Sequence, residues 1–223
     1  MAMAAGERAT APPIGRRRLL GGLAALLLPA FAGRSAAAIR PAAAVDEPVG
    51  ASLAGQLLIA TRDLADPIFG EAVIYLMAHD DGGALGLLVN RPGREVALAE
   101  IFDALGLDKA GVEGRITVYV GGPVEPQRPF LIHTPDMTMG ESRPLPGGLV
   151  LTNEPAMLKA IGKGKGPAKH LFAFGYVGWD GGQLEGELKR GDWFTIPPEL
   201  SLIFADEPAR SWERALQRRP TAL

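Results

Sequence analysis

The chain contains no cysteine among its 223 residues and only three histidines. A protein without thiols has no disulfide framework, no thiolate zinc site and no cysteine nucleophile, whatever its compartment. The serines beyond the N-terminal segment lie outside any Gly-x-Ser-x-Gly turn and have no recognisable histidine partner. These serines are Ser52, Ser142, Ser201 and Ser211. We therefore do not expect an acyl-transfer enzyme.

A phosphate-binding loop is also missing. The Gly121-Gly122 pair follows a predicted strand, as such a loop would, but Pro123 and Pro126 prevent the helix whose N-terminus would hold the phosphate. The Gly-Lys-Ser/Thr ending of such loops is absent too. The sequence predicts a turn at this point. We find no motif for a cofactor or a metal and expect none.

The chain has no surplus of positive charge, with 23 Lys and Arg against 25 Asp and Glu and a net charge of −2. A DNA-binding protein normally carries a positive surplus that neutralises phosphates. Beyond the N-terminal segment, Lys163, Lys165 and Lys169 form a basic cluster interleaved with glycines, which is typical of a solvated loop. The alternative is that this cluster binds an anion or an acidic partner.

The N-terminal segment resembles a twin-arginine export signal. Arg16-Arg17-Arg18 precedes an apolar run, Leu19 to Phe31, and then the small residues 35–38. The run is broken by glycine and proline and is shorter than the ~18–20 residues of a membrane-spanning helix, so we expect cleavage after Ala38 and no stable membrane span. Cleavage removes five arginines and one glutamate, which changes the net charge from −2 to −6. This interpretation places the protein in the periplasm, and the alternative is a cytoplasmic protein.

We divide the chain into a signal segment (1–38), a linker (39–54), one folded domain (55–218) and a tail (219–223). Apolar runs predict strands at Leu57–Ala60, Ala72–Ala78, Leu85–Val89, Ile116–Val120, Phe130–His133, Leu149–Leu151, Leu171–Tyr176 and Trp193–Ile196. Several of these runs are continuously apolar, which predicts burial on both faces.

Apolar residues at helical spacing predict three helices between and after these strands. The first is marked by Leu98, Ile101, Phe102 and Leu105, with Gly106 placed to end it. The second starts near Thr152 or Asn153 with Pro155 in its first turn, and the last starts near Asp206 with Pro208 early and Trp212, Ala215 and Leu216 inward. Because strands and helices do not alternate strictly, we predict an α+β fold with a bent, mainly antiparallel sheet and flanking helices.

The densest glycine pattern runs from Gly175 to Glu185. Asp180 and Gln183 match a capping box at the start of a fourth helix. This helix would bury Leu184 and Leu188 and pair Glu185 with Lys189 on its surface.

The same segment has a functional interpretation. Glycines without side chains would let an anionic ligand approach backbone amides at the helix N-terminus. The residues that would contact it are Gly178, Trp179, Gly182 and Gln183.

Ordered blocks along the domain resemble the YqgE/AlgH family. They are Gly55–Ala60, Asp66–Phe69, Val73–Leu76, His79-Asp80, Gly83–Pro92, Gly121–Val124, Phe130–His133, Leu151-Thr152, Gly175–Glu185, Trp193 and Leu202–Phe204. The resemblance implies a bent, partly barrel-like sheet, no established catalytic residues, and a transcriptional-regulator label that some members carry. Members are usually cytoplasmic, so the export-like leader departs from the family, and a periplasmic copy cannot regulate transcription by contacting DNA.

Two further groups of residues are candidates for function. Asn90 and Arg91 end a predicted buried strand, where Arg91 would either form an internal ion pair or bind a carboxylate or phosphate. His79 and His133 each end an apolar strand and would meet at one sheet edge as an acid–base pair.

These observations support three hypotheses. The first is a non-enzymatic binding or regulatory domain with an unknown protein or a small anionic ligand as partner, bound in a groove near the Gly175 segment and the Asn90-Arg91 turn. The second is a small-molecule enzyme that uses His79 and His133. The third is the cytoplasmic transcriptional regulator that the family label suggests.

Overall fold

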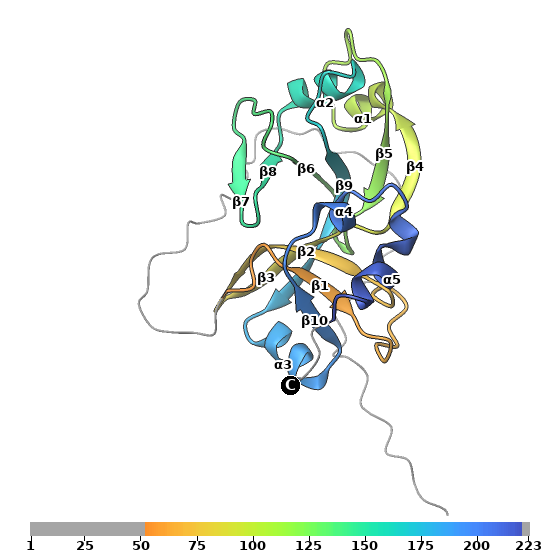
Figure 1. Cartoon of the computed structure of the whole chain (residues 1–223). Coiled ribbons are helices and arrows are strands. Elements are labelled where there is room, and N and C mark those ends of the chain that lie inside the picture. Colours follow the sequence, from red (N-terminus) through yellow and green to blue (C-terminus); the bar gives the residue numbers. More distant parts are fainter. Residues whose placement is uncertain (1–51, 220–223) are drawn as a thin grey trace, which may run out of the picture. The chain divides into compact units, whose positions relative to one another are not determined.

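The computed structural model describes residues 52–219, which belong to a unit that runs from Glu47 to Leu223 (Figure 1). The signal segment, most of the linker and the last four residues lie outside the described residues. Export and cleavage therefore stay predictions. No helix within residues 52–219 is long and apolar enough to cross a membrane.

Strands make up most of the described chain. In order they are β1 (Leu57–Ala60), β2 (Val73–Asp80), β3 (Gly83–Leu88), β4 (Pro92–Ala97), β5 (Arg115–Val120), β6 (Val124–His133), β7 (Arg143–Leu145), β8 (Leu149–Thr152), β9 (His170–Asp180) and β10 (Trp193–Ile196). The helices are α1 (Leu98–Ala104), α2 (Pro155–Gly162), α3 (Gln183–Arg190), α4 (Leu200–Ile203) and α5 (Ser211–Leu216), with a 3₁₀ turn at Pro208–Arg210.

These strands form one curled sheet in the order β10-β1-β2-β3-β9-β6-β8-β7, with β4 and β5 branching from β9. The pairs are antiparallel except β5 with β9, which is parallel. The sheet curls into a half-barrel, so the predicted α+β fold with a bent, mainly antiparallel sheet is confirmed. In Figure 1, β9 runs through the middle and joins the part with β4–β8 to the part with β1, β2, β3 and β10.

Strand β9 changes partners at a glycine. Along one edge, Phe172–Phe174 pair with β5 and Val177–Asp180 pair with β3, whereas β6 follows the other edge. Gly175 lies between these two stretches with φ of 75°, a conformation that favours glycine. A Cβ on Gly175 would lie 2.2 Å from the carbonyl oxygen of Gly122, so neither chain can carry a side chain there. The glycine density of this segment thus reflects a close backbone approach.

Strands β1 and β2 are buried on both faces over most of their length, as the continuous apolar runs predicted. In β2, Val73, Tyr75 and Met77 pack into one cluster, while Ile74 and Leu76 pack into the opposite one. Helices α4 and α5 cover the first cluster, α3 covers the second, and α1 and α2 cover a third on β5, β6 and β9. Figure 1 shows α1 and α2 at one end of the sheet and α3 at the other.

The three helices predicted from spacing are confirmed. Gly106 adopts the left-handed conformation expected after α1, with φ of 66°. Pro155 opens α2, and Pro208 opens the 3₁₀ turn before α5.

Two strands and one helix were not predicted. Strand β4 has no apolar run, because it is exposed along most of its length and its sequence includes proline and glycine. Strand β7 has three residues, and α4 has four.

The predicted capping box at α3 is wrong in one respect. Asp180 is still paired in β9, and the N-cap is Gly182, whose φ of 76° lets the helix begin at Gln183. One of the two capping-box bonds exists, because the Asp180 N–H donates to Gln183 Oε1 at 3.2 Å. Two glycines between strand and helix replace the cap that Asp180 would have made.

A buried carboxylate holds α3 against the sheet. Glu187 is 6% exposed and accepts hydrogen bonds from Trp179 Nε1 at 2.8 Å and Trp193 Nε1 at 2.9 Å. The Gln183 amide donates to its other oxygen at 2.8 Å. The carboxylate therefore satisfies two indole N–H groups that burial removes from water.

We expect Glu187→Ala to lower the free energy of unfolding by about 2–5 kcal/mol, because two buried indole donors lose their acceptor. Urea denaturation followed by circular dichroism measures this. Glu187→Gln keeps one carbonyl oxygen and should cost less. Lys189→Ala, on the exposed face of the same helix, is the control. Equal stability of Glu187→Ala and the control would contradict this role.

Candidate functional site

The Asn90-Arg91 turn is held by backbone contacts. Asn90 is 2% exposed; its Oδ1 accepts from the Val73 N–H and its Nδ2 donates to the Glu71 carbonyl, both at 2.9 Å. Arg91 donates to the carbonyl of Gly70. Asn90 thus ties the turn to the start of β2, where Glu71 takes a positive φ of 59°.

The residues singled out in the Gly175 segment also have structural contacts. Trp179 is 5% exposed and donates a hydrogen bond to Glu187. The Gln183 amide accepts from the Asp180 N–H through Oε1 and donates to Glu187 through Nε2. Gly182 faces open space, and a Cβ on Gly178 would meet only the Tyr176 ring, at 3.6 Å. There is space beside Gly178 and Gly182, but the polar side chains are engaged.

The structure does not bring these two groups together. Trp179 lies opposite Ala84, whereas Asn90 lies beyond the other end of β3. Ala84 and Asn90 are six positions apart along the chain, which corresponds to about 20 Å if it is extended. Trp179 and Asn90 therefore do not line one groove. The Gly175 end of the segment is closer to the turn, because the Val120 N–H donates to the Arg91 carbonyl at 3.0 Å and Gly121 packs against Gly175. Ligand binding by either group stays a prediction.

His79 joins the beginning of the described chain to α3. Its Nδ1 accepts from the Leu53 N–H at 3.0 Å, its Nε2 donates to Glu185 Oε1 at 2.7 Å, and its carbonyl accepts from Ser52 Oγ at 2.8 Å. A hydrogen bond from its own backbone and then the contact with His79 lower the pKa of Glu185. Glu185 thus contacts His79, and Lys189, with which the sequence predicted a surface pair, makes a smaller contribution to the lowered pKa of Glu185.

The predicted acid–base pair of His79 and His133 is wrong. His79 pairs with Ala84, which lies opposite Trp179 near the end of β9, whereas His133 pairs with His170 at the start of β9. His170 and Trp179 are nine positions apart on β9, about 30 Å of extended chain. The neighbour of His133 is His170, which we did not single out because strand register cannot be read from the apolar runs.

An apolar groove lies beside α1. This helix has only seven residues, and its buried side chains cover part of the face formed by β4, β5 and β9. The rest of the face forms a groove of about 490 Å³. It is lined by Gly93, Arg94, Val96, Glu100, Ile101, Ala104, Val118, Tyr119, Val120, Gly122, Pro126 and Phe174. Val120, the last residue of β5, is 55% exposed there and is one of the exposed large apolar residues of the described chain.

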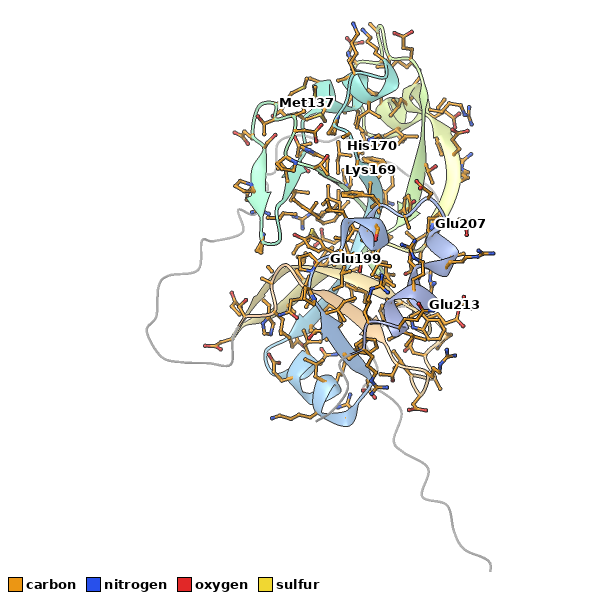
Figure 2. The ribbon with its side chains drawn as sticks, viewed as in Figure 1. Met137, Lys169, His170, Glu199, Glu207 and Glu213 are labelled. Carbon is orange, nitrogen blue, oxygen red and sulfur yellow. The ribbon has the colours of Figure 1, made fainter. Side chains whose placement is uncertain are left out.

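A second, larger hollow of about 660 Å³ lies beside α4 and α5. Figure 2 labels Lys169, Glu207 and Glu213, which contribute to its walls. Its charges are mixed and partly paired, with Lys169 and Asp206 at 3.7 Å and Arg210 and Glu207 at 3.1 Å. Because the cations are matched by nearby carboxylates, this hollow has no clear preference for an anion.

No group of three or more His, Cys, Asp or Glu side chains among residues 52–219 is arranged to hold a metal ion.

Comparison with known proteins agrees with the fold. The sequence profile described as AlgH-like matches residues 57–222. A UPF0301 protein of Methylococcus capsulatus is 40% identical over 167 residues, which cover 75% of this chain and 91% of that protein. A UPF0301 protein of Methylocella silvestris is 41% identical over 177 residues, covering 76% and 86%.

Solved structures agree as well. The solution structure of the AlgH protein from Pseudomonas aeruginosa superposes with a TM-score of 0.62 at 35% identity, covering 78% of this chain and 92% of that one. A Corynebacterium diphtheriae protein at 22% identity and a TM-score of 0.60 shares the fold. With the profile spanning most of the chain and relatives at 40% identity, this chain belongs to the AlgH-like family.

Proposed function

We propose that this protein is a non-enzymatic binding domain whose groove beside α1 takes a ligand with an apolar body and an anionic group. The observation that carries the proposal is the uncovered apolar face of β4, β5 and β9. Val120 is largely exposed, and Val118 and Phe174 are only partly buried, although all three lie on the face that α1 packs against. The volume of about 490 Å³ lies within the range of small-molecule sites.

A guanidinium at the rim supports the anionic part of the ligand. The Arg94 side chain is 79% exposed, and its nearest carboxylate, Glu100, is 3.9 Å away. An exposed ion pair at this distance contributes little to stability, so Arg94 can exchange Glu100 for an anionic group of a ligand. A carboxylate on the ligand could form the bidentate contact that Arg favours.

Export of the folded domain is part of the proposal and rests on the Arg16-Arg17-Arg18 segment. In that case the ligand or partner belongs to the cell envelope. Direct control of transcription is not included, because the protein without its leader would be acidic and separated from DNA.

The groove is tested with decanoate as the probe, measured by isothermal titration against the full chain. We expect Val120→Trp to weaken binding at least tenfold, because the indole fills the groove. Ile68→Trp is the matched control, since Ile68 is also an exposed apolar residue, at 44%, and does not line the groove. Arg94→Ala should remove the preference for decanoate over decanol. The proposal would be wrong if the protein did not bind decanoate, or if Val120→Trp bound it as tightly as the wild-type protein.

A second prediction separates the binding domain from an enzyme that uses His79. We expect His79→Ala to lower the free energy of unfolding by about 1–3 kcal/mol, because the Leu53 N–H and Glu185 lose their buried partner. The measurement is the thermal midpoint by calorimetry. An unchanged midpoint would show that the histidine is not structural and would reopen an acid–base role.

A further inference from the structure

Two imidazoles lie side by side on β6 and β9. His133 and His170 occupy directly opposed positions of this antiparallel pair, so their side chains share one face and their Cβ atoms are about 4.5–5.5 Å apart. His133 is fully buried, and His170 is partly buried. Figure 2 shows His170 next to Lys169 at the start of β9.

Backbone carbonyls determine which nitrogen of each ring carries the proton. His133 Nδ1 lies 2.7 Å from the Thr134 carbonyl oxygen, which only accepts, so Nδ1 donates and Nε2 keeps its lone pair. His170 is hydrogen-bonded to the backbone of Pro167, which has a carbonyl and no N–H. Since His170 Nδ1 has no partner, Nε2 makes this bond and Nδ1 keeps its lone pair.

Both lone pairs are buried without a protein donor. His133 Nε2 and His170 Nδ1 are two of the three buried side-chain polar atoms within residues 52–219 that lack a hydrogen-bond partner. Burying two adjacent nitrogen lone pairs without a hydrogen-bond donor costs free energy, unless both lone pairs bind the same proton or cation.

We propose that His133 Nε2 and His170 Nδ1 together bind one Cu(I) ion. Metal-binding histidines usually donate their other ring N–H to a carbonyl or carboxylate, which is the arrangement of both rings here. Zinc sites have three or four protein ligands, and calcium and magnesium require oxygen ligands. No third His, Asp or Glu in residues 52–219 completes such a set. Imidazole is a copper ligand, and Cu(I) accepts two ligands in a line, so the histidine pair suits Cu(I).

A carboxylate beside the pair supplies negative charge. Asp136 accepts from the Thr134 hydroxyl and, at 2.8 Å, from the Ala168 N–H, so it bridges the loops that adjoin His133 and His170. An ionised Asp136 would favour a cation between the rings.

The test is an anaerobic titration of the full chain with Cu(I) in competition with bicinchoninate. The chain has no thiol and only three histidines, so the soft donors that compete for Cu(I) are its six methionine thioethers. We expect one equivalent to bind, and His133→Gln and His170→Gln each to weaken binding at least 100-fold. His79→Gln is the matched control, since both nitrogens of His79 are already bonded.

Imidazole ¹⁵N spectra of the wild-type protein provide a readout that does not depend on folding of the variants. His133 Nε2 and His170 Nδ1 should have the shifts of bare nitrogens without metal and should move together on addition of Cu(I). Failure to compete with bicinchoninate, equal binding by the His133 variant, or a protonated His133 Nε2 at neutral pH would overturn the proposal. The lone pairs would then be satisfied by a buried water or a shared proton.

Discussion

The fold depends on the close approach of Gly175 in β9 to Gly122 before β6. This contact allows one strand to pair with β5 over its first half and with β3 over its second half, while β6 follows its other edge. A side chain at either glycine would collide with the facing backbone. Every cluster of buried side chains includes residues of β9, so the half-barrel is built on this junction.

The sequence predicted the elements whose signal is local. Continuous apolar runs located most strands, and the spacing of Leu98, Ile101 and Phe102 located α1 because a single helical face is buried there. Strand β4 was missed because an exposed edge strand needs no apolar pattern. The Asp180 cap was misassigned because the second glycine of the following pair, Gly182, takes a left-handed conformation that local pattern does not reveal.

The candidate sites were harder to predict because they depend on strand register and on helix length. His133 and His170 are distant in sequence and meet only because β6 pairs with the start of β9. The groove exists because α1 ends after seven residues, leaving Val120 uncovered. In contrast, Asn90, Trp179 and Gln183 stood out as polar or aromatic residues at turns, and the structure assigns their side chains to contacts within the fold.

The tryptophans are distributed so that two of them report on α3 and the third reports on α5. The chain has three: Trp179 and Trp193 share the carboxylate of Glu187 under α3, and Trp212 of α5 donates to the Ala60 carbonyl at 2.7 Å. Indole emission depends on burial and on nearby charge. The protein therefore carries intrinsic fluorescent probes at two places, and detachment of α3 can be distinguished from detachment of α5 without any attached dye.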